Sequence, residues 1–318
     1  MTDVLRIGTR KSVLARTQSG LVAELVRAKL GYAVELVDVT TEGDVNQAPL
    51  ATMGGTGVFV SALRDALLRG DVDIAVHSLK DLPTYPQEGI TLAAVPQRED
   101  PRDVVVARDG LTLGELPAGS VVGTGSPRRV AQLMALGLGL EIVGVRGNVD
   151  TRIGKVTSGE LDAVILAQAG LARLGRADEA TEVLDPLQML PAPGQGALAV
   201  ECRSADAELA KALADALEDP ATRAAVEAER AVLATLEAGC SAPLGALAEV
   251  VDGGDGDEIW IRAVALSYDG ALTVRMSTTG SPDDPVGVGR RLAEQMLDDG
   301  ASSLIERSSI DLARRQQG

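Results

Sequence analysis

This 318-residue sequence is poor in the side chains that bind metals and stack on bases. It has two cysteines, one histidine, one tryptophan, one phenylalanine and three tyrosines. So few soft ligands argue against a zinc or similar metal site, and we expect no metal. So few aromatic rings argue against a platform for single-stranded nucleic acid. The cysteines, Cys202 and Cys240, lie far apart in the sequence and need not pair in a reducing compartment.

Long apolar runs and an excess of positive charge are also missing. No stretch approaches the roughly 18 apolar residues of a membrane span, and residues 1–12 lack the apolar core of a signal peptide. The net charge is −16, which argues against general binding to nucleic acid or to anionic membranes. We therefore expect a cytoplasmic protein with neither a nucleic-acid nor a membrane partner.

The segments that are present alternate between short apolar runs and amphipathic stretches, as in α/β proteins. Hydrophobic residues make up 45% of the chain, enough to fill the cores of two or three domains. Strand, helix and strand patterns over residues 4–8, 13–30 and 33–39 predict a parallel sheet, and the same pattern starts again near residue 102. Two such repeats predict two similar lobes with a cleft between them.

The later part of the chain predicts a third domain. Residues 197–201 have the pattern of a strand that could return to the first lobe, and Asp219 and Pro220 mark a boundary. Strand patterns followed by a single helix are then typical of a small α+β domain. We predict lobe 1 over residues 1–96 with 197–217, lobe 2 over 102–191, and the C-terminal domain over 220–318.

Residues 73–83, DIAVHSLKDLP, concentrate polar side chains behind a predicted buried strand. The end of that strand delivers His77, Lys80 and Asp81 to a loop closed by Pro83. Open α/β sheets carry their chemistry at the C-terminal ends of their strands. Asp81 is a candidate acid or cation stabiliser, and the plain alternative is a surface ion pair with Lys80.

Basic side chains recur where helices are predicted to begin after strands. Helix N-termini offer unpaired N–H groups and positive partial charge, and the arginine fork binds two oxygens of a carboxylate or phosphate. Because the glycine turns fit no nucleotide-binding pattern, a carboxylate or phosphate ligand is favoured over a nucleotide. The basic positions are Arg10, Lys11, Arg128, Arg129, Arg146 and Arg152; Ser12, Thr124 and Ser126 would add neutral donors or act only as helix caps.

The two cysteines differ in their surroundings. Cys202 ends an apolar strand, where a buried and inert thiol is expected. Cys240 follows a helix in the glycine-flanked segment EAGCSAPLG, where it is either a quiet loop thiol or a nucleophile or attachment point.

Seven segments together resemble the porphobilinogen deaminase family, also called hydroxymethylbilane synthases. They run in order over nearly the whole chain: RIGTRKS at 6–12, HSLKDLP at 77–83, EDPRD at 99–103, GTGSPRR at 123–129, RGNVDTR at 146–152, PAPGQGALAVECR at 191–203 and EAGCSAPLG at 237–245. The resemblance implies two lobes like those of periplasmic binding proteins, a small α+β domain, and a monomer. It also implies a transferase that joins four porphobilinogen molecules head to tail, releases ammonia, and frees the linear tetrapyrrole hydroxymethylbilane.

The same resemblance implies roles for individual residues. Cys240 would anchor the dipyrromethane cofactor through a thioether, and Asp81 would be the catalytic carboxylate that stabilises the cation left by loss of ammonia. Other implied cofactor-binding residues are Lys80, Thr124, Ser126, Arg128, Arg129 and Gly147. Implied substrate-binding residues are Arg10, Ser12, Arg146, Arg152, Arg173 and Gln195.

Two other classes of protein remain open on the residues themselves. A two-lobed binding protein for a small polycarboxylate would use the arginines but gives no reason for a third domain with a loop thiol. A thiol hydrolase using Cys240 and His77 would need a partner to orient the histidine, and none is evident.

Overall fold

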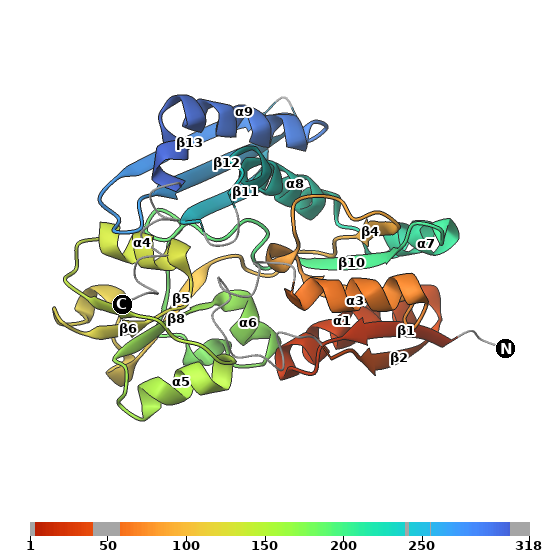
Figure 1. Cartoon of the computed structure of the whole chain (residues 1–318), viewed down its shortest axis with the longest axis horizontal. Coiled ribbons are helices and arrows are strands. Elements are labelled where there is room, and N and C mark those ends of the chain that lie inside the picture. The colour runs from red at the N-terminus through yellow and green to blue at the C-terminus, as the bar shows by residue number, and fades with distance from the viewer. Residues whose placement is uncertain (1–3, 41–57, 239–241, 255, 306–318) are drawn as a thin grey trace. The chain divides into compact units, whose positions relative to one another are not determined.

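The computed structural model describes residues 4–40, 58–238, 242–254 and 256–305 (Figure 1). The chain divides into two compact units: residues 1–99 with 197–223, and residues 100–196 with 224–318. Residues 197–223 thus belong to the same unit as residues 1–99. The predicted division into three domains stays a prediction, because lobe 2 and the C-terminal residues fall in one unit. Among the described residues, no helix is long and apolar enough to cross a membrane.

The first unit is built on a five-stranded sheet in the order β2-β1-β3-β10-β4. Its strands are β1 (Val4–Thr9), β2 (Ala33–Asp38), β3 (Ile74–Ser78), β4 (Ile90–Ala94) and β10 (Leu198–Arg203), and its helices are α1 (Val13–Leu30), α3 (Val58–Arg69) and α7 (Ala207–Leu217). The predicted parallel pairing holds for β1 with β2 and β3, and β10 joins the sheet antiparallel to β3 and β4. Leu198 pairs with Ser78, so β10 begins where β3 ends and must run the opposite way.

Helix α1 shows how local sequence builds this unit. The Ser12 hydroxyl accepts a hydrogen bond from the Ala15 N–H at the helix start. Gly31 ends the helix at φ 72°, a left-handed conformation that glycine adopts without a steric penalty. Between these caps, Val22 and Val26 lie one helical turn apart and pack into the core beneath the sheet.

The second unit contains another five-stranded sheet, in the order β7-β6-β8-β5-β9. Its elements are β5 (Asp103–Ala107), β6 (Val121–Gly123), α4 (Pro127–Ala135), β7 (Glu141–Val143), α5 (Val149–Thr157), β8 (Ala163–Ala167), α6 (Gln168–Arg173) and β9 (Glu182–Val183). Strand β6 is parallel to β7 and β8, whereas β5 is antiparallel to β8 and β9. Asp103, at the start of β5, consequently lies level with Ala167, at the end of β8.

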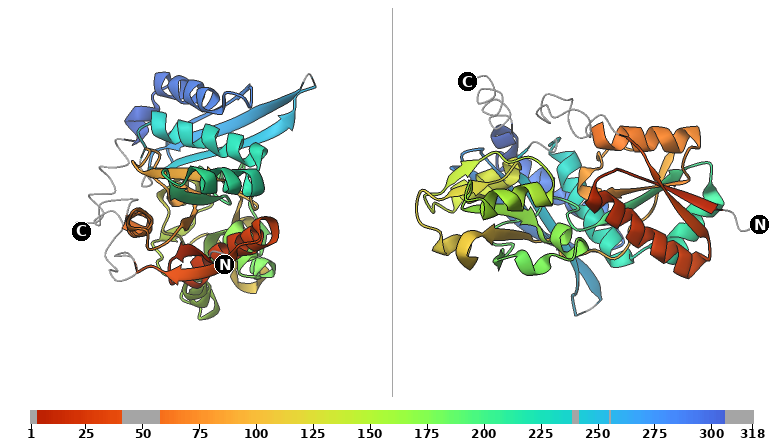
Figure 2. Two further views of the ribbon diagram at one scale, coloured as in Figure 1. Left: turned by 90° about the vertical axis from the view of Figure 1, so that its right-hand side faces the viewer. Right: turned by 90° about the horizontal axis from the view of Figure 1, so that it is seen from below.

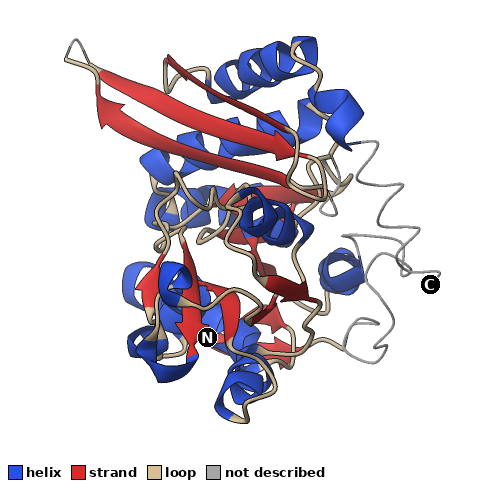
Figure 3. Cartoon of the chain, turned by 90° about the vertical axis from the view of Figure 1, so that its left-hand side faces the viewer, coloured by secondary structure: helices blue, strands red, loops and turns tan. Residues whose placement is uncertain are grey.

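An antiparallel meander completes the second unit (Figure 3). It consists of β11 (Leu244–Asp252), β12 (Asp257–Leu266) and β13 (Thr273–Gly280), with α8 (Pro220–Thr235) and α9 (Pro285–Asp298). Alternate residues of β12, such as Ile259 and Ile261, share a core with Val232 of α8 and Leu292 of α9. The hairpin of β11 and β12 reaches past the ends of both helices (Figure 2).

The opposite face of this meander packs on helix α4. Val264 and Leu266 form a small core with Ala131 of α4 and with Leu190. The turn after β12 approaches α4 so closely that a Cβ atom on Gly270 would lie 2.5 Å from the Ala131 carbonyl oxygen. Glycine is required there both by this contact and by its φ of 70°.

Candidate active site

In the first unit, the predicted site residues gather at one edge of the sheet. Strands β1 and β3 are parallel neighbours, with Ile7 level with Ile74. Their carboxyl ends therefore open on the same edge, as expected for an α/β sheet. Four sequence-predicted residues follow these two strand ends: Arg10, Ser12, Lys80 and Asp81.

A single turn of 3₁₀ helix, Leu79–Asp81, presents the carboxylate of Asp81. Leu79 is fully buried, and its N–H donates to the Ala197 carbonyl oxygen at 3.0 Å. Leu82 is also buried and donates back to Leu79, which closes the turn. Asp81 is exposed, and its carboxylate makes no hydrogen bond or ion pair with any residue that the structure describes. Its oxygens are thus available to a ligand, and the simple alternative of an ion pair with Lys80 is not observed.

Beneath this turn lies a buried group of charges. Glu201 of β10 accepts two aligned hydrogen bonds from Arg64 of α3, at 3.0 and 2.7 Å. His77 Nε2 lies 3.3 Å from the same carboxylate, but off the line of a hydrogen bond, so Arg64 is the stronger partner. Burial raises the pKa of Glu201, yet contacts with His77 and Arg64 outweigh it and lower the pKa to about 2. The only histidine therefore faces a buried carboxylate, rather than a thiol, among the described residues.

In the second unit, two arginines at the start of α4 share one buried carboxylate. Arg128 Nη1 donates to Asp103 Oδ2 at 2.7 Å, and Arg129 Nη2 donates to Oδ1, also at 2.7 Å. Asp103 is fully buried, and both arginines are nearly so. Burial raises the pKa of Asp103, but the two guanidinium groups reverse this effect and hold the pKa well below its usual range. Burial likewise lowers the pKa of Arg128.

Positive charge exceeds negative charge around this carboxylate. Arg152 of α5 is close enough to Arg129 that burial and repulsion from Arg129 lower its pKa. Its Nε donates to the Gly147 carbonyl oxygen at 2.9 Å, which brings no compensating charge. The Nε of Arg128 is buried and has no hydrogen-bond partner among the described residues. An excess of buried guanidinium groups is the setting in which an anionic ligand is bound strongly.

Two further predicted residues are tied into the same edge of the sheet. The Gln195 side chain is buried, and its Nε2 donates to the Pro101 carbonyl oxygen at 2.7 Å and to Asp103 Oδ1 at 2.8 Å. Arg173 of α6 donates to the Gly196 carbonyl oxygen at 2.6 Å. The segment that contains Gln195 is therefore held beside the arginine cluster by Asp103, at the start of β5, and by Arg173 of α6.

The remaining predicted residues of this unit occupy turns. Thr124 is buried and accepts a hydrogen bond from the Ser126 N–H at 3.2 Å. Ser126 precedes α4 without capping it through its side chain. Gly147 has φ 104°, and a Cβ there would lie 2.8 Å from the Cβ of Thr151. Arg146, beside it, is exposed.

Of the two cysteines, the structure describes only Cys202. Cys202 is fully buried in β10, as expected, and burial raises the pKa of its thiol to about 11. Cys240 lies outside the described residues, as does the glycine-containing segment 53–57. Its nearest described neighbours along the chain follow α8 and precede β11.

Two buried carboxylates, Asp103 and Glu201, have no predicted role from the sequence alone. Both are acids at the ends of apolar strand patterns, DVVVA and LAVEC, where a charge must find a partner if the strand is buried. An acid at the end of an apolar strand pattern could therefore have indicated a role for Asp103. Its partners are the two arginines of the segment GTGSPRR, Arg128 and Arg129. No group of His, Cys, Asp and Glu suited to a metal occurs within the described ranges.

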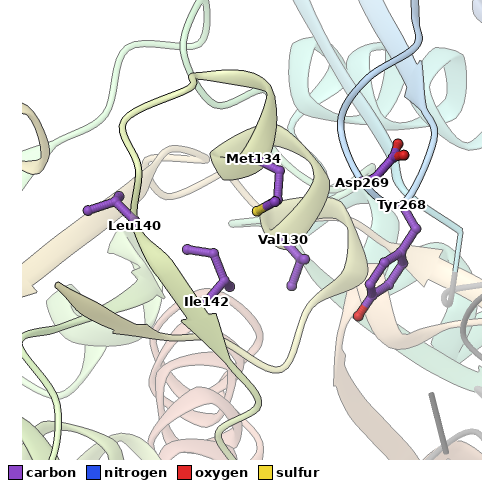
Figure 4. Close-up of a pocket in the computed structure, with 6 residues that line it drawn as sticks. All are labelled: Val130, Met134, Leu140, Ile142, Tyr268 and Asp269. Atoms are coloured by element: carbon purple, nitrogen blue, oxygen red, sulfur yellow. The ribbon is translucent and has the colours of Figure 1, made fainter. Parts of the chain in front are cut away.

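A groove of about 190 Å³ lies elsewhere in the second unit (Figure 4). Apolar side chains of α4 and β7 line it, together with the turn that follows β12. Its lining has no basic side chain, so it is not a candidate for the anion site. The lining residues are Val130, Met134, Leu140, Ile142, Tyr268 and Asp269.

Each of the two α/β sheets has basic residues after the ends of its parallel strands; the first also has an exposed carboxylate there, and the second has a buried arginine cluster. Edges of this kind suit a protein that binds small polyanions. Two family models together match nearly all of the chain: "Porphobilinogen deaminase, dipyromethane cofactor binding domain" over residues 5–211 and "Porphobilinogen deaminase, C-terminal domain" over residues 223–298. The chain belongs to the porphobilinogen deaminase family. The fold class, enzyme activity and dipyrromethane cofactor predicted from the sequence are thereby confirmed.

Curated porphobilinogen deaminases are similar in sequence to this chain over almost their full length. Porphobilinogen deaminase of Nocardia farcinica is 58% identical over 99% of this chain and 90% of its own. Porphobilinogen deaminase 1 of Streptomyces coelicolor is 58% identical over 96% of this chain and 98% of its own. Porphobilinogen deaminase of Mycobacterium tuberculosis is 56% identical over 95% of this chain and 98% of its own.

Solved structures with a similar fold include binding proteins. The methionine-binding protein MetQ matches 67% of this chain and 89% of its own, with a TM-score of 0.44 and 15% identity. A putative methionine-binding lipoprotein of Bacillus subtilis matches 68% and 90%, with a TM-score of 0.42 and 15% identity. This likeness concerns the fold alone, and it gives the binding-protein alternative no functional support.

Proposed function

We propose that Asp81 is the catalytic carboxylate of this porphobilinogen deaminase and that Cys240 carries its dipyrromethane cofactor. The observation that supports the proposal most strongly is the excess of buried arginine around Asp103. The cofactor and every porphobilinogen bring acetate and propionate groups, and carboxylates are the partners that uncompensated guanidinium groups bind. The residues present therefore fit the cofactor.

Asp81 would act on the positive charge that develops when porphobilinogen loses ammonia. Its carboxylate has no described protein partner, so it can accept hydrogen bonds from pyrrole N–H groups and stabilise a neighbouring cation through space. When bound, the dipyrromethane supplies the pyrrole carbon to which the first substrate is joined. The rigid turn between Leu79 and Leu82 would hold the carboxylate still while the chain lengthens.

The predicted binding residues fall into two groups in this proposal, one for the cofactor and one for the substrate. Cofactor carboxylates and ring edges would contact Lys80, Thr124, Ser126, Arg128, Arg129 and Gly147. Substrate carboxylates would contact Arg10, Ser12, Arg146, Arg152, Arg173 and Gln195. The hydroxyl of Ser12 already caps α1, and the amide nitrogen of Gln195 already donates to Asp103. These two would therefore act through their remaining hydrogen-bonding capacity.

The mass of the intact purified protein tests the attachment. An excess equal to two linked pyrroles, mapped to the peptide containing Cys240, is the expected result. Cys240→Ser should remove the excess, whereas Cys202→Ala, which alters the buried thiol, should keep it. Loading of Cys240→Ser to the same extent as the unaltered protein would place the anchor on another residue.

The proposal also covers where the enzyme is located in the cell and its oligomeric state. We expect a cytoplasmic monomer that takes porphobilinogen as its small-molecule substrate. Cell fractionation tests the location, and light scattering of the purified holoenzyme tests the assembly.

A further inference from the structure

Glu229 is a fully buried carboxylate in α8 that has no role in the scheme above. Its Oε2 accepts a hydrogen bond from the Gly194 N–H at 2.6 Å. Its Oε1 accepts one from the Ala248 N–H at 2.9 Å. Burying a carboxylate is costly unless hydrogen bonds compensate it, so these contacts fix the side chain firmly in one position.

Two of the three segments joined by this carboxylate lie on either side of the predicted attachment point in the sequence. Helix α8 ends shortly before Cys240, and β11, which contains Ala248, begins shortly after it. Gly194 belongs to the segment that precedes β10. Glu229 therefore fastens both flanks of the cysteine segment to the backbone of residues 191–196.

That backbone leads directly to the arginine cluster. Gln195, the next residue after Gly194, donates from its side chain to Asp103. Asp103 in turn holds Arg128 and Arg129. A continuous series of hydrogen bonds and one peptide unit thus connects the flanks of Cys240 to the two guanidinium groups.

We propose that Glu229 is a positioning residue that holds α8 and β11, the described elements on either side of Cys240 in the sequence, in place relative to Arg128 and Arg129. The inference rests on the proposed roles of Cys240, Arg128 and Arg129. Glu229 acts through Gly194, Gln195 and Ala248. Its loss should impair cofactor loading and turnover more than it impairs substrate binding.

Glu229→Gln tests this role with little change in shape. The amide offers one acceptor oxygen, so its NH₂ group faces one of the two backbone N–H groups, which loses its partner. The test uses protein molecules that do not yet carry the cofactor. After porphobilinogen is added, intact mass measures how fast these molecules gain the cofactor, and we expect this rate to be at least 10-fold lower in the variant. In the loaded fraction, kcat should fall while KM for porphobilinogen changes less than twofold.

Val232→Ala on the same helix is the matched control. Val232 is fully buried in the core between α8 and the meander, so its truncation lowers the melting temperature without removing a hydrogen bond. It should load at nearly the unaltered rate. If the two variants lose loading in proportion to their melting temperatures, Glu229 is merely structural and the inference is wrong.

Two further measurements keep the test decisive. If Glu229→Gln does not fold, Glu229→Asp replaces it: the shorter side chain withdraws from at least one N–H, and loading at the unaltered rate would overturn the inference. Should the unaltered protein itself remain unmodified at Cys240 after porphobilinogen is added, the proposed attachment fails. If the unaltered protein and Glu229→Gln both gain the cofactor to the same extent and at the same rate, the positioning role of Glu229 is refuted, and the attachment at Cys240 is not.

Discussion

Carboxylates in this chain have different tasks according to what surrounds them. Asp103 and Glu201 are buried and each faces an arginine, so they remain charged and organise their neighbours. Asp81 is exposed at the edge of its sheet, with no partner among the described residues. An acid that the fold leaves unpaired beside basic side chains is the one best suited to meet a developing cation.

Replacing Asp81 with alanine should abolish turnover and leave the fold intact. The side chain supports no described contact, so the melting temperature should stay within a degree or two of the unaltered value. We expect kcat to fall by about 10²–10⁴ or more, since the variant loses a charge opposite the forming cation. Glu88→Ala removes another exposed acid of the same unit and should keep full activity. Substantial turnover in Asp81→Ala would refute the catalytic role.

The pKa of Glu201 predicts how stability depends on pH. Because folding lowers this pKa from 4.5 to about 2, the carboxylate stabilises the folded state fully above pH 5. The contribution, about 3 kcal/mol, should be lost as pH falls from about 4.5 toward about 2. The measurement is the difference in free energy of unfolding between the unaltered protein and Glu201→Gln, from urea titrations at several pH values. A difference that does not shrink in acid would contradict this account.

At the scale of elements, short turns place the basic residues. Proline at the first position of α4 starts the helix, and its N-terminal turn then carries Arg128 and Arg129 to the edge of the sheet. Asn148 caps α5 by accepting the Thr151 N–H at 2.8 Å. The turn before that cap depends on Gly147, whose backbone lies in the left-handed region.

Gly147→Ala should therefore disturb the turn between β7 and α5. The new Cβ would meet Thr151 at 2.8 Å in a conformation that alanine rarely adopts. We expect a loss of about 1–3 kcal/mol in the free energy of unfolding and a rise in KM for porphobilinogen, because Arg146 and Arg152 flank the turn. Urea titration and steady-state kinetics check both effects.

Gly154→Ala is the matched control for this substitution. Gly154 lies inside α5, and an added Cβ meets nothing within 4 Å. Alanine there should stabilise the helix by about 1 kcal/mol and leave KM unchanged. Equal effects of the two substitutions would show that the turn has no special importance.

At the scale of the whole molecule, the first unit is not continuous in sequence. Strand β10 comes roughly one hundred residues after β4, yet it lies between β3 and β4 in the sheet. Without it, β4 has no partner among the described strands. The interior of this sheet therefore forms only when distant parts of the chain meet.

A fragment of residues 1–96 should consequently fail to fold. Joining residues 1–96 to residues 197–223 through a short glycine-serine linker restores β10 and α7, and this fragment should fold cooperatively. Circular dichroism during urea titration distinguishes the two. A cooperative transition in the shorter fragment would show that β10 is dispensable for the sheet.

The amino-acid sequence by itself determined the elements, the polar residues that follow them, and the family. Helix α1 occupies residues 13–30 as the sequence pattern predicts, and the seven motifs led to the family that the comparisons confirm. These features depend on near neighbours: a hydrophobic period, a capping side chain, a glycine or proline at a turn. They can therefore be read along the chain.

Only the tertiary structure decided which charges meet. Asp103 reaches Arg128 and Arg129 because β5 runs antiparallel to β8 and starts at the edge where α4 begins. Glu201 meets Arg64 because β10 enters the first sheet against the direction of β3. Strand direction and order depend on packing across the whole core, which no local pattern encodes. The same reason explains why Glu229, inside a helix rich in alanine, could not be recognised from sequence as the link to Gly194.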